Sequence, residues 1–240
     1  MNDGFAAWRF ELLLPWRLRE IAAAAPMAYV PLGTLEWHCE HLPVGLDALT
    51  AHGLCLRAAT RSGGVVLPAL HYGTGGGHGA YPWTIMMRTS QEIEGQLSST
   101  LEKLRGFGFK KIMLFSGHFP EAQLEMIDRL AAHHSRDDFT VLAGAVSRIP
   151  GLAYQPDHAG IFETTLLAAM WPELVQLQHL SKNPLPDGDS DFGDGRHDSA
   201  HPIHGVFGPD PRNYDAAQAA PLLEMAVAFL AQQMTREFLT

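Results

Sequence analysis

The sequence has few cysteines, an excess of acidic over basic residues, and no apolar run of membrane-spanning length. Cys39 and Cys55 are the only cysteines in 240 residues, too few for a disulfide framework, so we expect a reducing, cytoplasmic location. Lysines and arginines number 17 against 26 aspartates and glutamates, giving a formal net charge of −9, which argues against a nucleic-acid partner. Pro15 interrupts the apolar run that begins at Leu12, and we expect neither a membrane span nor a signal peptide.

Strand-like and helix-like segments alternate along the chain. Hydrophobic residues make up 46% and charged residues 18% of it, as in globular proteins. The expected strands are 27–32, 65–70, 111–115 and 139–146, and the expected helices are 48–61, 91–105, 120–135, 161–171 and 222–238. This alternation predicts a three-layer α/β fold with a mostly parallel sheet and helices on both faces. No linker or repeat divides the sequence, so we expect a single domain over residues 1–240.

Three side chains that favour metal binding follow the first expected strand. Glu36 and His38 would point to the same side of an extended segment, because side chains alternate along a strand. Asp47 follows a turn at the expected start of a helix. Carboxylate and imidazole groups together suit Zn²⁺ or Mn²⁺, and a carboxylate that bridges two ions suits a two-metal hydrolase. Cys39 is a further candidate ligand, although a buried neutral thiol is the simpler interpretation.

The spacing of these residues resembles a family signature. Residues 31–47, PLGTLEWHCEHLPVGLD, are similar to the creatininase (creatinine amidohydrolase) string P-x-G-S-x-E-Q-H-G-P-H-L-P-L-G-T-D. Trp37 replaces the usual Gln, and Cys39-Glu40 replaces Gly-Pro. Further strings match in order: HGAYPWTI at 78–85, SGH at 116–118, DHAGIFETT at 157–165 and GVFGPDPR at 205–212. The resemblance extends from about Leu32 to the end and implies a creatininase-like fold.

The resemblance also implies two divalent ions per chain. These are Zn²⁺, Mn²⁺ or both, with Fe²⁺ as a further candidate. By the same resemblance, Asp47 is shared between the two ions. The implied ligands of one ion are Glu36 and His118, and those of the other are His38 and Glu163.

The last of these ligands has an alternative. Some family members use a glutamate two residues after the histidine that corresponds to His118, and that position is Pro120 here, with Glu121 beside it. A carboxylate in the first turn of a helix is already explained by the helix dipole. We therefore favour Glu163 over Glu121.

The implied reaction is hydrolysis of a C–N bond in a small cyclic amide, a formamide or a peptide-like amide. In this interpretation His158, supported by Asp157, transfers a proton to the leaving nitrogen. The residues expected to contact the substrate are His78, Trp83, Phe119 and Tyr154. Tyr154 stands where creatininase places a substrate-facing tryptophan, which argues against creatinine itself as the substrate.

Two other functions are compatible with the same sequence. The site could cleave an ester, a lactone or a cyclic ketone, or the chain could be a non-catalytic family member, although its intact ligand set argues against the latter. The expected partners are a small-molecule substrate and further copies of the chain, with a hexamer implied by resemblance. Residues 183–213 form a long segment that is either functional or mobile. Its histidines, at 197, 201 and 204, favour a solvated loop over an adventitious metal site.

Overall fold

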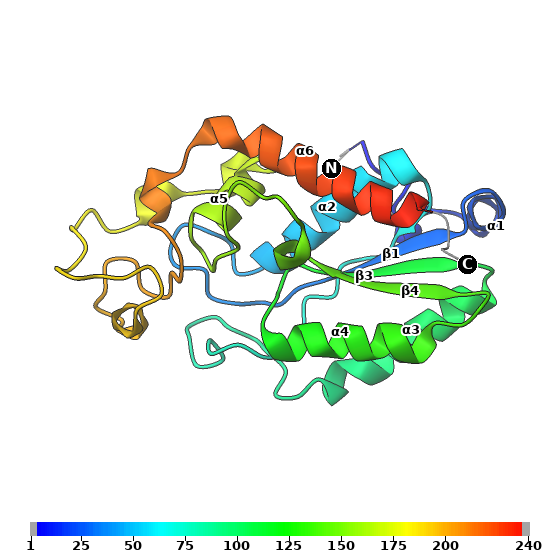
Figure 1. The fold of residues 1–240 in the computed structure, drawn as a ribbon, viewed down its shortest axis with the longest axis horizontal. Helices are drawn as coiled ribbons and strands as arrows, with labels where there is room; N and C mark the ends of the chain where they lie inside the picture. The colour runs from blue at the N-terminus through cyan, green and yellow to red at the C-terminus, as the bar shows by residue number, and fades with distance from the viewer. Residues whose placement is uncertain (1–3, 237–240) are drawn as a thin grey trace.

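The computed structural model describes residues 4–236 and shows a parallel sheet between two layers of helices (Figure 1). The strands are β1 (Met27–Leu32), β2 (Val65–Val66), β3 (Lys111–Ser116) and β4 (Thr140–Ala145). They lie in the order β2-β1-β3-β4, and every neighbouring pair is parallel. The helices are α1 (Pro15–Ala24), α2 (Leu46–Ser62), α3 (Gln91–Gly106), α4 (Glu121–His134), α5 (Ile161–Ala168) and α6 (Ala219–Thr235).

Each face of the sheet supports its own apolar core. Tyr29, Met113 and Phe115 pack against α2, α5 and α6 on one face. The alternate strand residues, such as Val30 and Leu114, pack against α3 and α4 on the other. A strand that is buried on both faces needs a continuous apolar run, which is what β1 and β3 contain. The predicted three-layer α/β fold is confirmed.

Several element boundaries differ from the predicted ones. The second strand was expected to extend over residues 65–70 but ends at Val66, because Pro68 has no N–H for the ladder. Its course alongside β1 resumes at Leu70, whose carbonyl accepts from Gly33 N at 2.9 Å. Helix α1 was not predicted. Helix α5 ends at Ala168, short of the expected residue 171, and α6 begins at Ala219; the expected end of α6 at 238 lies outside the described residues.

The first turn of α2 lies against the ends of β1 and β3 because two glycines leave room for it. A Cβ at Gly33, just after β1, would lie 2.1 Å from the backbone N of Ala48. A Cβ at Gly117, just after β3, would lie 2.0 Å from the backbone O of Asp47. Real Cβ atoms cannot approach backbone so closely, so these two positions require glycine. The contact places Asp47 directly over the carboxyl ends of the two central strands.

Replacing Gly33 should therefore destabilise the fold. We expect Gly33→Ala to lower the free energy of unfolding by about 1–3 kcal/mol or more, because the new methyl group must displace backbone. The matched control is Gly95→Ala, in α3, where a Cβ meets nothing within 4 Å and alanine favours the helix by about 1 kcal/mol. Chemical denaturation of both variants measures the difference. A Gly33→Ala protein as stable as the parent would contradict the close approach.

Candidate metal centre

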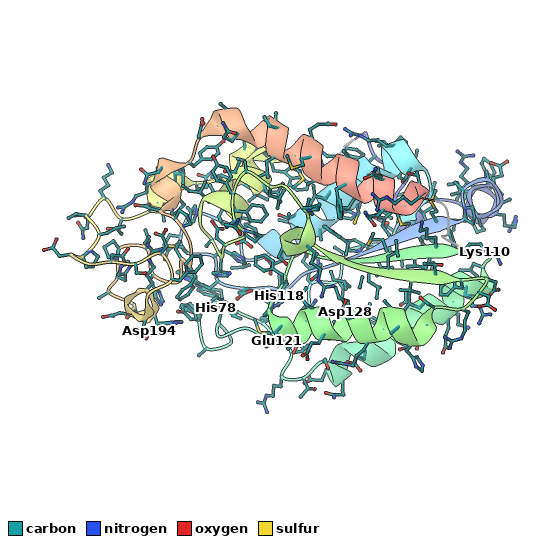
Figure 2. All side chains as sticks on the ribbon, viewed as in Figure 1. His78, Lys110, His118, Glu121, Asp128 and Asp194 are labelled. Atoms are coloured by element: carbon teal, nitrogen blue, oxygen red, sulfur yellow. The ribbon has the colours of Figure 1, made fainter. Side chains whose placement is uncertain are left out.

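Four segments of the chain meet at the carboxyl ends of β1 and β3. The loop after β1 carries Glu36 and His38, and the first turn of α2 carries Asp47. His118 follows β3, and the first turn of α5 contributes Glu163. All five side chains are at most 4% exposed. Ligands of parallel α/β sheets collect at this edge, and Figure 2 shows His118 there with His78 close by.

Asp47 lies between two groups of side chains. In the first group, His118 Nδ1 is 3.0 Å from Glu36 Oε2 and 3.2 Å from Asp47 Oδ2. In the second, His38 Nε2 is 3.3 Å from Asp47 Oδ1 and 3.5 Å from Glu163 Oε2. Each group offers three potential ligand atoms within 4.8 Å of one another. The two carboxylate oxygens of Asp47 therefore face different groups, as a bridging carboxylate would.

Backbone carbonyls orient both histidines. His38 Nδ1 lies 2.9 Å from the carbonyl O of Glu36, and His118 Nε2 lies 3.2 Å from the carbonyl O of Gly75. In the neutral ring, the nitrogen that faces a carbonyl carries the proton, which leaves the lone pair on the other nitrogen. That other nitrogen is the one that faces the carboxylates in each case. Metal-binding histidines in proteins are commonly fixed in this way.

The donor set fits divalent cations. Glu36, Asp47 and Glu163 bring three carboxyl groups into a buried space, where unpaired negative charge is strongly unfavourable. Glu36 Oε2, Asp47 Oδ2 and His38 Nε2 are buried and make no aligned hydrogen bond. Each of them points into the space between the clustered side chains. Two oxygens with one nitrogen in each group is a donor combination that Zn²⁺ and Mn²⁺ both accept.

The pKa values of the cluster reflect this concentration of charge. Burial lowers the pKa of His38 and of His118, but the adjacent carboxylates outweigh burial and raise each pKa to about 10. Burial raises the pKa of Asp47, yet the two histidines reduce it to about 2. For Glu163 burial dominates, and its pKa lies well above the usual range. The cluster retains its negative charge only when positive charge is close by.

A cavity of about 150 Å³ opens onto this cluster. Its lining residues are Glu36, Asp47, Gly76, His78, His118, Phe119, Pro120, His158 and Glu163. His78 Nδ1 lies 2.5 Å from Glu36 Oε1, and the His158 ring centroid lies 4.4 Å from that of His38. Burial lowers the pKa of His158 to about 3, which keeps its ring neutral. The cavity therefore brings together four of the five expected ligands, all but His38, with His78, Phe119 and His158.

Asp157 does not lie behind His158. One oxygen of Asp157 accepts from the backbone N of Gly160 at 3.2 Å and of Glu163 at 3.3 Å, and the other accepts from Phe162 N at 2.9 Å. His158 Nε2 instead lies 2.9 Å from the carbonyl O of Trp37. The geometry therefore contradicts the expectation that Asp157 supports the His158 ring. Asp157 satisfies the free N–H groups at the start of α5.

Two expected substrate contacts lie outside the cavity. The Trp83 side chain is 78% exposed, and its φ of +60° is one that glycine adopts more easily. The backbone around Trp83 turns its indole toward solvent, away from the substrate contact that we expected. Tyr154 is half-buried and packs against the core beneath α2, α5 and α6. Neither residue is among those that line the cavity.

The other candidate ligands have different surroundings. Cys39 is buried, its pKa is raised to about 11 mainly by burial, and it belongs to none of the potential ligand groups found among residues 4–236. His197 Nδ1 lies 2.5 Å from Tyr81 Oη, the His204 ring stacks on Tyr81, and His201 Nε2 lies 3.1 Å from Asp189. These three histidines all contact other residues; His197 is exposed, and His201 and His204 are half-buried.

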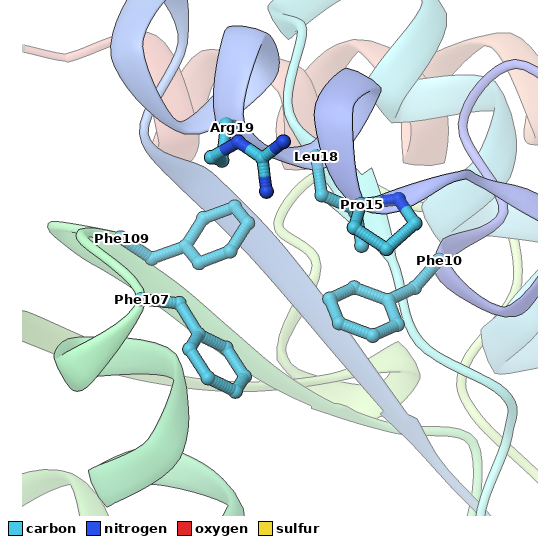
Figure 3. A pocket seen from close by; sticks show the side chains of 6 residues that line it. All are labelled: Phe10, Pro15, Leu18, Arg19, Phe107 and Phe109. Carbon is cyan, nitrogen blue, oxygen red and sulfur yellow. The ribbon is translucent and has the colours of Figure 1, made fainter.

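A second hollow, of about 480 Å³, lies near α1 and the segment that precedes β3 (Figure 3). Its lining residues are Phe10, Pro15, Leu18, Arg19, Phe107 and Phe109. Arg19 is its only charged lining residue, and none of the six is a metal-ligating type. The segment before β3 lies at the opposite end of the strand from His118. This apolar hollow is therefore not the candidate catalytic site.

Residues 16–234 match the creatininase family, described as creatinine amidohydrolase. The chain belongs to the creatininase family. It is 26% identical to the creatinine amidohydrolase of Pseudomonas putida over 94% of this chain and 95% of that protein. A crystal structure of a creatininase superposes with a TM-score of 0.77 at 25% identity, covering 97% of this chain and 98% of the other. A putative creatinine amidohydrolase from Bacteroides fragilis, 22% identical and covering 100% of both chains, has the same fold with a TM-score of 0.75.

The resemblance that the sequence suggested is thus confirmed at the level of the family. Phe207 is a cavity neighbour that the sequence did not single out: its ring lies 5.2 Å from His78, nearly parallel to it. It lies in the matching string at 205–212, which was the available signal. The string gives no information about where Phe207 lies in space, because Phe207 contacts His158 only in the folded protein.

The geometry favours Glu163 over Glu121 as the remaining ligand of this creatininase-family site. Glu163 is 4% exposed and its Oε2 approaches His38. Glu121 is exposed in the first turn of α4 and belongs to no ligand group among the described residues (Figure 2). Pro120 is two residues after His118 and lines the cavity, but its side chain has no ligating atom.

A pair of variants tests this assignment. Glu163→Ala should reduce the metal content by about one ion per chain, because Asp47 and His38 alone form an incomplete site. Glu121→Ala, the matched control, should keep the parent's content. Elemental analysis of the purified, metal-loaded proteins gives the stoichiometry. Loss of an ion in Glu121→Ala alone would reverse the assignment.

Proposed function

We propose that this chain is a single-domain, metal-dependent amidohydrolase that binds two divalent ions and cleaves a C–N bond of a small amide. The observation that carries the proposal is the position of Asp47 between two groups of potential ligands. Glu36, Asp47 and His118 would hold one ion. The other would be held by His38, Asp47 and Glu163.

Zn²⁺, Mn²⁺ or a mixture of the two is the proposed metal content, with Fe²⁺ as a further candidate. Similar folds include a creatininase described as a Mn form and a creatininase variant described as Zn-Zn type. When bound, such ions lower the pKa of a water molecule and polarise a substrate carbonyl. Membership of an amidohydrolase family and the buried donor set support the same metals here.

His158 is the proposed proton-transfer residue. It lines the cavity, and its Nε2 is held by the carbonyl O of Trp37 at 2.9 Å. A neutral imidazole fixed in this way can accept a proton from an attacking water and deliver it to the leaving nitrogen. One of its nitrogens also lies within 4.8 Å of potential ligand atoms of Glu36 and His38. Metal content must therefore be measured alongside activity.

The cavity supports a small substrate. Its volume is about 150 Å³, and its lining residues include no lysine or arginine. Small cyclic amides, formamides and peptide-like amides are the proposed substrate classes, with His78 and Phe119 as the side chains that contact them. A similar creatininase structure is described as a complex with creatine, which supports a small molecule without identifying it.

The proposal extends to the oligomeric state and the cellular location of the protein. We propose a homo-oligomer, with a hexamer suggested by family resemblance, because closed symmetric assemblies are common. No helix among residues 4–236 has both the length and the hydrophobicity to cross a bilayer. Cys39 and Cys55 are both free and buried, which suits the reducing cytoplasm that we propose.

Cleavage of an ester, a lactone or a cyclic ketone is the alternative reaction. The same ligand groups would support it, since polarising a carbonyl and activating water are common to these reactions. A metal-loaded protein tested against a panel of small cyclic amides, formamides, peptide-like amides, lactones and esters discriminates among these substrates. Turnover of lactones or esters with no turnover of any amide would overturn the amidohydrolase proposal. A protein without turnover on any of them, but with bound metal, would favour a binding role.

Substitution of His158 tests its role directly. His158→Ala should keep the parent's two ions per chain and lower kcat by about 10²–10⁴-fold, the usual contribution of general acid–base residues. Asp47→Asn serves as the contrasting variant, since it should lose metal at both positions. Elemental analysis and steady-state kinetics with the amide that the parent hydrolyses provide the two measurements. Metal loss in His158→Ala would instead identify His158 as a ligand.

A further inference from the structure

Arg196 is a fully buried charged residue that the proposed reaction does not use. It lies in the short 3-10 helix Asp194–His197 and is 0% exposed. Its Nη2 lies 2.7 Å from Asp189 Oδ2, and its Nη1 donates to the carbonyls of Asp191, Val206 and Gly208. A buried guanidinium is tolerated only when its donors are satisfied. Arg196 therefore holds together the segment from Asp189 to Gly208, called the positioning arm below.

The carbonyls that Arg196 binds include those on either side of Phe207. Phe207 in turn forms a two-bond bridge with His158: His158 N donates to Phe207 O, and Phe207 N donates to His158 O, each at 2.8 Å. The backbone of His158 is thus held by a residue whose two neighbours are held by Arg196. This bridge is antiparallel and joins the positioning arm to the turn before α5.

The arm is also in close contact with the residue before His158. A Cβ at Gly208 would lie 2.4 Å from Asp157 Cβ, so only a glycine lets the arm approach this closely. Asp157 itself binds the first N–H groups of α5, which carries Glu163. The turn at 157–158 is therefore fixed on one side by the helix and on the other by the arm.

The side chain of Phe207 reaches the other cavity histidine. Its ring lies 5.2 Å from the His78 ring at an interplanar angle of 14°. Within the arm, the His197 ring centroid lies 4.5 Å from that of Phe207. His197 Nδ1 also lies 2.5 Å from Tyr81 Oη, and Tyr81 is in the loop that carries His78. His78 and His158, the two cavity histidines outside the proposed ligand set, therefore both contact Phe207.

We propose that Arg196 is a positioning residue for His158, acting through the backbone of Phe207. This inference rests on the proposed function, in which His158 transfers a proton at the metal centre. Arg196 contacts neither the cavity nor the proposed ligands. Its effect on the reaction is to fix where the His158 imidazole stands, and displacements of about 1 Å in such groups can cost about 100-fold in rate.

Amide hydrogen exchange in the full-length protein tests the arm without requiring a substrate. Arg196→Lys keeps the positive charge but cannot reach the same set of carbonyls and carboxylates. We expect the His158 and Phe207 amides to exchange at least about ten-fold faster than in the parent, because their bridge opens more often. Asp189→Asn removes the nearer of the two carboxylates that pair with Arg196, at 2.7 Å, and leaves Asp191 at 3.2 Å. It should shift both amides in the same direction by less.

Arg212→Lys is the matched control. Arg212 also pairs with an aspartate, Asp210, at 2.7 Å, and donates to the carbonyls of Ser181 and Asn183. Those carbonyls lie outside the positioning arm. Arg212→Lys should therefore leave the exchange of the His158 and Phe207 amides as in the parent.

Kinetics and metal analysis separate positioning from a purely structural role. With the amide that the parent hydrolyses, Arg196→Lys should lower kcat by about 10–100-fold, change KM by less than about two-fold, and keep the parent's Zn²⁺ content. Unchanged exchange in both Arg196→Lys and Asp189→Asn would overturn the proposal. Faster exchange with an unchanged kcat, or a loss of Zn²⁺, would also overturn it.

A substitution at Arg196 that prevents folding leaves Asp189→Asn as the deciding variant, read by the same exchange and kinetic measurements. Failure of the proposed function is recognised separately. If the parent hydrolyses no amide, the amidohydrolase proposal fails, while the exchange of the His158 and Phe207 amides still decides whether Arg196 holds the bridge.

Discussion

The close approach of the first turn of α2 to the ends of β1 and β3 is the contact on which the rest of the centre depends. Gly33 and Gly117 permit it because neither has a side chain to separate the backbones. The approach brings Asp47 within reach of side chains from both strands at once. A bulkier residue at either glycine would move the shared carboxylate away from the histidines, and the two ligand groups would lose their common member.

Two helix starts reduce the electrostatic cost of burying this centre. Asp47 lies in the first turn of α2 and Glu163 in the first turn of α5. Free N–H groups and the helix dipole favour negative charge at such positions, by about 0.3–1 kcal/mol at exposed sites and more where the site is partly buried. Asp157 takes up free N–H groups of α5, and the backbone N of Ala159 donates to Glu163 Oε2 at 2.7 Å, which directs the Glu163 carboxylate. These contributions would help the two carboxylates to remain ionised beside the proposed cations.

The parts of the molecule that sequence patterns predicted are those governed by local rules. Apolar runs bounded by glycine predicted the central strands. The positions of Glu36, His38 and His118 just after these strands predicted that they lie at one edge of the sheet. The role of Asp157 was predicted incorrectly, because neighbours in sequence suggested a pair while the carboxylate faces the helix start. Trp83 was expected to contact the substrate, but its backbone conformation turns it outward. No local sequence pattern predicts the direction in which a side chain such as Asp157 or Trp83 points.

The segment 183–213 shows most clearly why the remainder could not be predicted. Its composition is that of a loop, and composition alone could not distinguish a functional segment from a mobile one. Its order comes from Arg196, whose partners are separated from it in sequence, and its relation to the centre comes from the bridge between Phe207 and His158. The proposed metal ligands lie in the first turns of helices and just after strand ends, while the residue proposed to move protons is held from a loop. The ligand set can thus stay constant while this loop changes how His158 is presented to a substrate.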